Sequence, residues 1–400
     1  MNILFLTMNP FTDIEMHNIY SDLMKVFIEH GHRPYIVTPR EKSSGEQTEL
    51  LDFDTYSLLK VRVGNTSGVS LIEKGISTVT LSGLYYRAVK KYLSGISFGL
   101  ILYSTPPITL YGPVRKLKRD FHCRTYLMLK DIFPQNAVDL AMFGKGGLLY
   151  RYFRGKEKGL YRVSDAIGCM SQANVDYLMH RNPEISADKV EICANAILPH
   201  PLTDRTAQKA AVREQYHISR EATVYLYGGN LGKPQGIDHL IRCLDANAGK
   251  SDRFFIICGS GSEYPMLEAY IRDEHPSNVR LIRFLPKDRY DALAAGCDVG
   301  LIFLDSRFTI PNYPSRILSY MENAMPVVVC SDDVTDIGTD AERGGYGYTS
   351  SAKDVDSFTK AVDKMNASDI VQMGKAAREY LEQHFDAHDC YNCIMGRCEP

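Results

Sequence analysis

The sequence predicts an α/β protein built from two doubly wound, Rossmann-like domains. Its 400 residues exceed one ordinary hydrophobic core and suit two domains of about 150–200 residues each. Short apolar runs of strand length alternate with helical patterns along both halves of the chain. This alternation is typical of parallel sheets covered by helices on both faces.

In the first half, residues 3–6 form a short apolar strand, and residues 13–30 are expected to form a helix with Leu23, Val26 and Phe27 on one face. A second strand is expected at 34–38. Further strands are predicted at 59–63, 100–103, 124–129, 166–170 and 189–192, and further helices at 84–93, 109–120, 147–162 and 173–179.

Two prolines and a loss of periodicity at residues 198–203 predict a linker. The alternation then restarts and ends in a long helical region at 369–385. We therefore place a first domain at 1–198, a linker at 199–207 and a second domain at 208–377. The strands of the second domain are predicted at 224–227, 254–258, 279–283, 299–303 and 326–330.

Composition narrows the class of protein. Hydrophobic residues make up 44% and charged residues 24%, as in soluble globular proteins, and the net charge of −2 argues against a nucleic-acid partner. No apolar run reaches the ~18–20 residues of a membrane span, and residues 1–7 resemble a strand rather than a signal peptide. Most of the ten cysteines lie in apolar strands, which is typical of reduced, buried thiols in the cytoplasm.

One cysteine cluster has two interpretations. His388, Cys390, Cys393 and Cys398 include a Cys-x-x-Cys spacing that zinc sites use. The pattern lacks a second paired half and lies in a helical segment, so an ordinary terminal helix is the favoured interpretation.

A glycine-rich turn follows the first strand of the second half. Gly229, Asn230, Gly232 and Lys233 lie between an apolar run and a helical pattern. Such turns leave backbone N–H groups free near a helix N-terminus, where they hold phosphate groups. Because ligands of doubly wound sheets bind at the carboxyl ends of strands, we expect a diphosphate here.

Three other loops should meet this turn. Gly259 and Gly261 follow the next strand, either as ligand contacts or as a tight turn, and the backbone of Phe284 and Leu285 is placed to meet a base edge. A further helix begins at Pro314, with Ser315 and the cation of Arg316 in its first turn. Ser319 and Glu322 share one face of that helix and are candidates for ribose hydroxyls.

The first half offers a second set of candidates. Asn9, Phe11 and Thr12 follow the first strand, and His17 is expected one turn into the next helix, as either a structural or a functional histidine. Lys130 and Asp131 follow another strand, as a cation and a possible base.

Two basic segments occur at 115–119 and 148–158. The second mixes leucines, aromatic residues and cations, as helices on anionic membranes do. A solvated helix face is the competing interpretation.

Together these residues resemble the retaining GT-B glycosyltransferases of family 4, in particular the bacterial branch that builds capsule and O-antigen polysaccharides. The most specific match is the run 310–316 with Tyr320, Met321 and 326–328. The family pattern is also matched by residues 15–17 and 31–32 and by the basic-Asp pair Lys130–Asp131. Asn195 lies where the family has a Pro-Asn-Gly element. The resemblance implies that the segment 378–400 returns to the first domain, and that Asn9, Phe11, Thr12 and Asn195 lie on the acceptor side.

The chain departs from the family pattern at several positions. Where the family carries two glutamates near the donor, this chain has Pro311 and Ser319. Where the family carries Arg and Lys in the glycine-rich turn, this chain has Asn230 and Gln235. We expect Lys233 and Arg316 to replace the cations and Glu322 to replace a ribose-binding carboxylate.

The resemblance implies retaining transfer of a sugar from a nucleotide diphosphate, favoured as UDP, to a glycan that is lipid-linked. Lys130, Asp131, His17, Arg316 and Lys233 are the expected catalytic residues. No Asp-x-Asp motif follows a strand of the second half, so no metal or other cofactor is expected. The rivals are a catalytically silent subunit that binds a nucleotide or glycan in a polysaccharide complex, and a sugar-nucleotide 2-epimerase. We place the protein in the cytoplasm, with peripheral contact at the inner membrane face.

Overall fold

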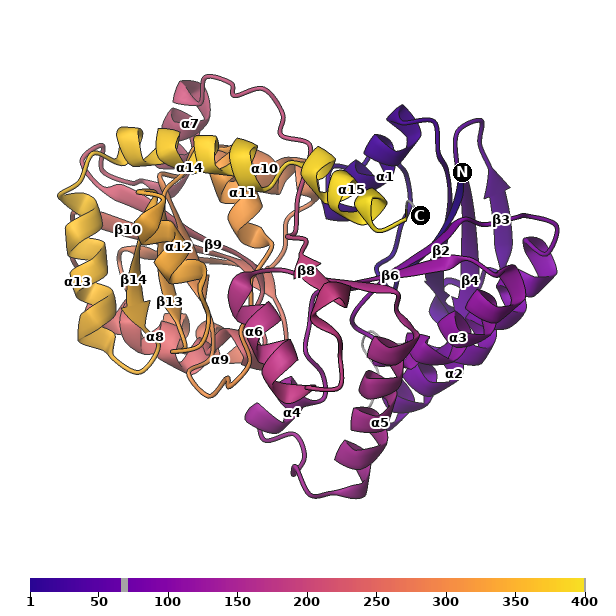
Figure 1. Cartoon of the computed structure of the whole chain (residues 1–400). Coiled ribbons are helices and arrows are strands. Elements are labelled where there is room, and N and C mark those ends of the chain that lie inside the picture. The colour runs from indigo at the N-terminus through magenta and orange to yellow at the C-terminus, as the bar shows by residue number, and fades with distance from the viewer. Residues whose placement is uncertain (66–70, 399–400) are drawn as a thin grey trace. The chain divides into compact units, whose positions relative to one another are not determined.

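The computed structural model describes residues 1–65 and 71–398, which form two compact units (Figure 1). The first unit comprises Met1–Leu198 together with the chain from Ala387 onward, and the second comprises Pro199–Asp386. None of the described helices combines the length and the apolar character needed to span a bilayer.

The first unit contains a sheet of eight strands in the order β3-β4-β2-β1-β5-β6-β7-β8. All neighbouring pairs are parallel except β3 and β4. The strands are β1 (Asn2–Leu6), β2 (Arg33–Glu41), β3 (Glu49–Asp52), β4 (Ser57–Val63), β5 (Leu100–Ser104), β6 (Arg124–Leu129), β7 (Ala166–Cys169) and β8 (Val190–Ile192).

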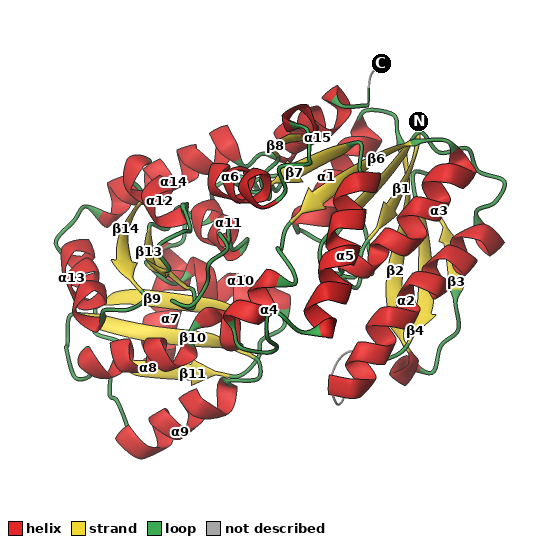
Figure 2. Ribbon diagram, turned by 60° about the horizontal axis from the view of Figure 1, so that its bottom comes forward, coloured by secondary structure: helices red, strands yellow, loops and turns green. Residues whose placement is uncertain are grey.

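Helices cover both faces of this sheet (Figure 2). Successive strand residues such as Leu4 and Phe5 point to opposite faces of the sheet, and each face has its own buried cluster. Helices α2, α3, α5 and α6 pack on one face, and α1 and α15 pack on the other. The helices are α1 (Ile19–Glu29), α2 (Leu71–Tyr92), α3 (Tyr111–Phe121), α4 (Gln135–Asp139), α5 (Leu148–Val163), α6 (Gln172–Arg181) and α15 (Ala387–Gly396), with 3₁₀ turns η1 (Lys42–Ser44), η2 (Ile108–Leu110) and η3 (Ala187–Lys189).

The second unit contains a fully parallel sheet of six strands in the order β11-β10-β9-β12-β13-β14. Its strands are almost continuously apolar because both faces are buried. They are β9 (Thr223–Asn230), β10 (Arg253–Ser260), β11 (Val279–Ile282), β12 (Val299–Phe303), β13 (Val327–Ser331) and β14 (Gly347–Ser351).

Helices α8, α9 and α13 bury one face of the second sheet, around Phe255, Leu301 and Phe358. Helices α11 and α12 pack on the other face, where Tyr320 lies against Gly300 and Gly338 lies against β13. The helices are α7 (Thr206–Tyr216), α8 (Ile237–Ala246), α9 (Tyr264–Glu274), α10 (Lys287–Ala295), α11 (Arg316–Glu322), α12 (Ile337–Arg343), α13 (Val355–Asn366) and α14 (Ile370–His384), with the 3₁₀ turn η4 (Lys233–Gln235).

The predicted fold class is confirmed, and some element bounds differ from the predictions. The helix expected at 13–30 begins only at Ile19, because the Asn18 side chain accepts the N–H groups of Tyr20 and Ser21 and caps it there. The edge strands β3 and β14 were not predicted. Helix α14 stays with the second unit, so the segment that packs on the first unit begins at Ala387 rather than at residue 378, and its last two residues lie outside the described chain.

Candidate functional site

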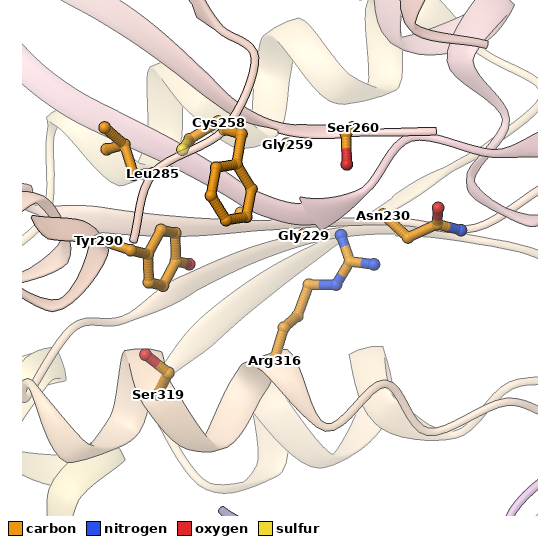
Figure 3. A pocket seen from close by; sticks show the side chains of 11 residues that line it. Gly229, Asn230, Cys258, Gly259, Ser260, Leu285, Tyr290, Arg316 and Ser319 are labelled. Carbon is orange, nitrogen blue, oxygen red and sulfur yellow. The ribbon is translucent and has the colours of Figure 1, made fainter. Parts of the chain in front are cut away.

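A pocket of about 500 Å³ opens at the carboxyl ends of β9 and β10 in the second unit (Figure 3). All four predicted segments contribute to its wall, the last of them through helix α11. The lining residues are Gly228, Gly229, Asn230, Cys258, Gly259, Ser260, Phe284, Leu285, Tyr290, Arg316 and Ser319. Gly228, Cys258, Ser260 and Tyr290 were not among the predicted site residues; Tyr290 lies on α10, and no motif marks it in the sequence.

Close packing explains the glycines at the two strand ends. Gly259 lies opposite Gly229 in the register of β9 and β10, and a Cβ on Gly259 would lie 1.9 Å from the carbonyl oxygen of Gly229. Gly229 itself has a φ of +119°, which strongly favours glycine. Gly261 does not line the pocket; a Cβ there would lie 2.3 Å from the carbonyl oxygen of Leu231, so this position is a tight turn.

Arg316 places a cation in the pocket. Its guanidinium carbon lies 4.5 Å from the centre of the Tyr227 ring and 3.7 Å from where a Cβ on Gly229 would be. Within the described chain, its Nη1 atom is buried and has no hydrogen-bond partner. A buried cationic donor without a partner is costly unless an anion fills the space beside it.

The glycine-rich turn is neutral at the positions where the family carries cations. The Asn230 amide donates to the Gln235 side-chain oxygen at 3.0 Å, and the Gly232 N–H donates to the same oxygen at 3.1 Å. Lys233 is exposed and, like Gly232, does not line the pocket. Arg316, rather than the turn, therefore supplies the positive charge at this site.

The start of α11 contributes through its side chains and not through its N-terminus. Pro314 and Ser315 do not line the pocket, whereas Arg316 and Ser319, one turn apart, both do. The predicted ligand contacts of Pro314 and Ser315 therefore stay predictions outside this pocket wall.

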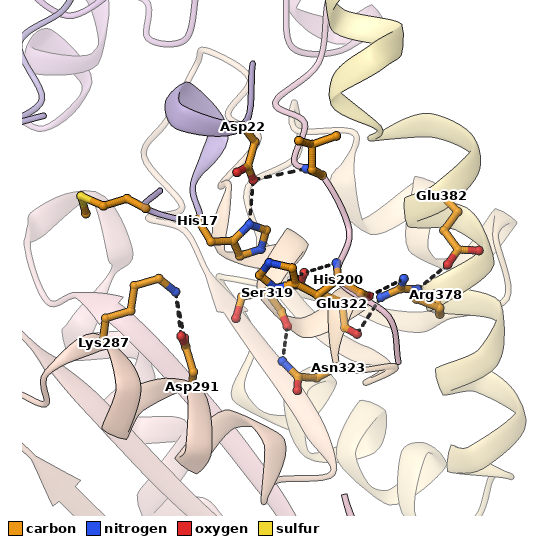
Figure 4. A network of polar contacts seen from close by, with 12 residues as sticks. His17, Asp22, His200, Lys287, Asp291, Ser319, Glu322, Asn323, Arg378 and Glu382 are labelled. Atoms are coloured by element: carbon orange, nitrogen blue, oxygen red, sulfur yellow. Dashed lines mark hydrogen bonds and ion pairs between the residues drawn. The ribbon is translucent and has the colours of Figure 1, made fainter. Parts of the chain in front are cut away.

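Glu322, which we predicted to replace a ribose-binding carboxylate, does not line the pocket either. Its Oε1 accepts the backbone N–H of His200 at 2.9 Å (Figure 4). Arg378 of α14 donates to the carbonyl oxygens of Glu322 and His200 at 3.1 and 2.8 Å. Glu322 is thus part of a polar network that fixes the segment around His200 to α11 and α14.

In the first unit, Lys130 and Asp131 follow β6, as predicted. The Lys130 ammonium donates to the side-chain oxygen of Asn195, and burial lowers the pKa of Lys130. The Asn136 amide nitrogen donates to the Asp131 carboxylate and lies 2.9 Å from each of its oxygens, yet burial raises the pKa of Asp131 to about 6. A carboxyl group with this pKa can exchange a proton near neutral pH.

His17 precedes α1 rather than lying within it. Its Nδ1 lies 2.8 Å from the carboxylate of Asp22, which is fully buried (Figure 4). This pairing fixes the ring orientation as a carboxylate does in histidine acid–base sites. The sequence pattern did not identify Asp22, although it lies five residues from His17 on the same segment.

The loop after β1 is only partly available for an acceptor. Phe11 is buried in the cluster between the sheet and α1, which leaves its side chain little surface for the predicted acceptor contact. Asn9 and Thr12 are exposed. Asn195 is buried and accepts a hydrogen bond from the Lys130 ammonium, so little of its side chain is left for the predicted acceptor contact.

The terminal cysteines do not converge. Among the described residues, His388, Cys390, Cys393 and Cys398 form no group close enough to hold one metal ion. The Cys390 sulfur lies 3.3 Å from that of Cys193, and the Cys398 thiol donates to the carbonyl oxygen of Ile394. The ordinary-helix interpretation agrees with this arrangement.

Comparisons with known proteins show what the second unit resembles. Residues 208–382 match the family model "Glycosyl transferases group 1". The chain is 20% identical to the probable glycosyltransferase WbjE of Pseudomonas aeruginosa, over 80% of this chain and 78% of that one. It is 23% identical to the putative colanic acid biosynthesis glycosyl transferase WcaI of Escherichia coli K12, over 71% and 68%.

Solved structures share the fold over both units. Sucrose-phosphate synthase from Thermosynechococcus elongatus aligns with a TM-score of 0.75 at 13% identity, over 99% of this chain and 97% of that one. Anabaena Alr3699/HepE in complex with UDP and glucose aligns with a TM-score of 0.70 at 14% identity, over 99% and 98%. Residues 208–382 are therefore similar to the glycosyl transferases group 1 family, and the chain as a whole has the two-domain GT-B fold.

Proposed function

We propose that this protein is a retaining glycosyltransferase that moves a sugar from a nucleotide diphosphate, UDP in the first instance, to a growing lipid-linked glycan of a capsule, O-antigen or exopolysaccharide. The observation that carries the proposal is the unpartnered Nη1 of Arg316 in the pocket beside Gly229. The family match, the polysaccharide named for WcaI, and the UDP and glucose in the HepE complex support it.

The chemistry follows from the position of the charge. Loss of the diphosphate develops negative charge on its oxygens, and a fixed cation there stabilises the transition state more than the ground state. Arg316 is the cation for this step. The leaving phosphate takes the acceptor's proton on the same face, so retention needs no pair of carboxylates and no metal. In the first unit, the proposed catalytic residues are Lys130, Asp131 and His17, the last of which lies beside Asp22.

A thermal-shift screen with UDP, GDP, CDP and dTDP, with and without magnesium, tests the donor site, because a ligand of the native state raises Tm. One diphosphate is expected to shift Tm without metal, and Arg316→Ala should abolish the shift. Arg272→Ala is the matched control, since Arg272 is an exposed arginine of the same unit that pairs with Asp273. No shift with any diphosphate would contradict the proposal.

Turnover of the matching nucleotide sugar with a glycan acceptor is the second measurement. Transfer with retention of the anomeric configuration is expected. Tight binding of the diphosphate without transfer by the purified chain would instead favour the nucleotide-binding partner subunit.

We also propose that α5 of the first unit contacts an anionic membrane. Leu148 and Leu149 at its first turn are 84% and 51% exposed, and Tyr152 follows on the same helix. Arg151 is exposed, and the Lys156 ammonium lies over the Tyr152 ring at 5.3 Å. Exposed leucines beside an aromatic ring and cations favour the interface of an anionic bilayer.

The structure narrows the residues for testing this contact. Arg154 pairs with the buried Glu157, so changing it would disturb the fold, and Lys158 is already paired with Glu184. Leu148→Ser/Arg151→Glu/Lys156→Glu should therefore lower binding to phosphatidylglycerol vesicles at least tenfold in a flotation assay, by about 1 kcal/mol for each charge near the surface. Arg242→Glu/Arg272→Glu is the control in the second unit. Unchanged binding by the triple variant would leave α5 an ordinary solvated helix.

A further inference from the structure

The pocket of the second unit lacks a carboxylate. Among its eleven lining residues, all in the described part of the chain, Arg316 is the charged one. The other side chains able to form strong hydrogen bonds are the amide of Asn230 and the hydroxyl groups of Ser260, Tyr290 and Ser319. The Asn230 amide is already bound to Gln235. A ribose in this pocket would therefore meet hydroxyl groups and not an anion.

The nearest carboxylate on α11 is engaged elsewhere. Glu322 follows Ser319 by one helical turn, and its Oε1 accepts the backbone N–H of His200 at 2.9 Å. Arg378 holds the same segment through the carbonyl oxygens of Glu322 and His200. Releasing Glu322 to bind a sugar would break its hydrogen bond to the His200 N–H.

This arrangement determines how strongly a ribose hydroxyl can be recognised. A site built to bind a hydroxyl through a buried anion rejects an analogue that lacks the hydroxyl, because the anion is left unpaired. A serine on a helix behaves differently, because its hydroxyl can rotate to the carbonyl oxygen four residues earlier. Ser319 therefore loses little when the ligand offers no 2′-hydroxyl group.

We propose that the pocket does not distinguish ribose from 2′-deoxyribose, so that its donors include sugars on a thymidine diphosphate as well as on a ribonucleoside diphosphate. The inference rests on the proposed function and specifies the substrate class of that site. The apolar part of the wall, formed by Cys258, Phe284 and Leu285, also suits the extra methyl group of thymine.

Isothermal titration with three diphosphates separates the two effects. UDP against 2′-deoxy-UDP isolates the hydroxyl group, and 2′-deoxy-UDP against dTDP isolates the methyl group. We expect Kd values for UDP and 2′-deoxy-UDP within about threefold, and dTDP equal to 2′-deoxy-UDP or up to about fourfold tighter. GDP against 2′-deoxy-GDP replaces the first pair if guanosine proves to be the preferred base.

The outcomes separate this inference from the proposed function. A preference of more than about tenfold for the ribose form would overturn the inference and leave the glycosyltransferase proposal intact. Absence of binding by all the diphosphates would overturn both.

An engineered carboxylate provides an independent test. Ser319→Glu places an anion where the ribose is expected and should raise the preference for UDP over 2′-deoxy-UDP above tenfold. Ser319→Gln has the same length without the charge and should leave the ratio near its original value. Both variants must melt cooperatively near the parent Tm. An unchanged ratio in a folded Ser319→Glu protein would overturn the assignment of Ser319 to the ribose.

Discussion

At the scale of single residues, two polar side chains in the two units have unusual environments. Arg316 has a buried donor without a partner, and Asp131 has a raised pKa although it accepts two hydrogen bonds from Asn136. On the protein surface, water would bind the Arg316 donor, and the pKa of Asp131 would stay near its ordinary value; burial prevents both.

Asp131 makes stability depend on pH in a defined direction. Its pKa rises from an ordinary value of 3.8 to about 6, so between these values the native state holds a proton that the unfolded state has lost. Stability therefore falls as pH rises through this window, by about 3 kcal/mol in total.

Asp131→Asn should remove that decline. The variant loses one hydrogen bond to Asn136 at every pH, but its Tm should fall less than that of the parent between pH 4.5 and pH 7.5. Calorimetry at the two pH values measures the difference. Parallel pH profiles for the two proteins would show that Asp131 titrates normally.

At the scale of elements, Arg154 forms an ion pair with the buried Glu157 within α5 and also bonds to the end of α6. Arg154 bonds to Glu157 at 2.6 Å and donates to the Arg181 carbonyl oxygen and the Asn182 side chain. Glu157 is almost fully buried, and burial raises its pKa. Loss of Arg154 would leave a buried carboxylate without its cation.

Arg154→Ala should therefore destabilise the first unit by about 3 kcal/mol at pH 7.5. Adding Glu157→Gln should restore part of this loss, because the uncompensated charge is removed. Urea unfolding followed by circular dichroism measures both variants. If the double variant were no more stable than the single one, lost packing rather than charge would explain the effect.

The elements also show how far the sequence could predict the structure. Long apolar runs such as 224–227 predicted strands correctly, because their burial on both faces leaves no other interpretation. The edge strands β3 and β14 escaped prediction because they are partly exposed and lack a continuous apolar run. The start of α1 depends on the Asn18 cap, which periodicity does not register.

The site was predictable only where chain position determines geometry. The turn at Gly229 and the helix at Arg316 follow from strand ends and were located correctly. The engagement of Glu322 with His200, the pairing of His17 with Asp22, and the place of Tyr290 depend on tertiary contacts. No spacing rule gives those contacts.

At the scale of the whole molecule, the C-terminal helix α15 completes the core of the first unit. Tyr391 stacks on His30, lies 5.0 Å from the Phe27 ring and bonds to the His32 side chain at 3.0 Å. Ile394 is fully buried in the same cluster. The first unit therefore depends on residues from both ends of this sequence.

Tyr391→Ala should lower the free energy of unfolding of the first unit by about 3–5 kcal/mol. The Tm of the first unit should fall accordingly, and the Tm of the second unit should stay the same. Leu381→Ala is the matched control, because Leu381 is buried in α14 of the second unit. Differential scanning calorimetry resolves the two transitions if the units melt separately. Equal displacement of both transitions by Tyr391→Ala would show that the units unfold together.

The close approach of Ile197 and Ala387 has a practical consequence for the architecture. The Ala387 N–H donates to the Ile197 carbonyl oxygen at 2.9 Å, so the two points where the chain leaves and re-enters the first unit already touch. The second unit is thus one continuous stretch of chain inserted into the first unit, which is formed by two separate stretches. A linker of two or three residues between Leu198 and Ala387 would close the first unit after the second unit is removed, and second units of other proteins with this fold could be exchanged at the same junction.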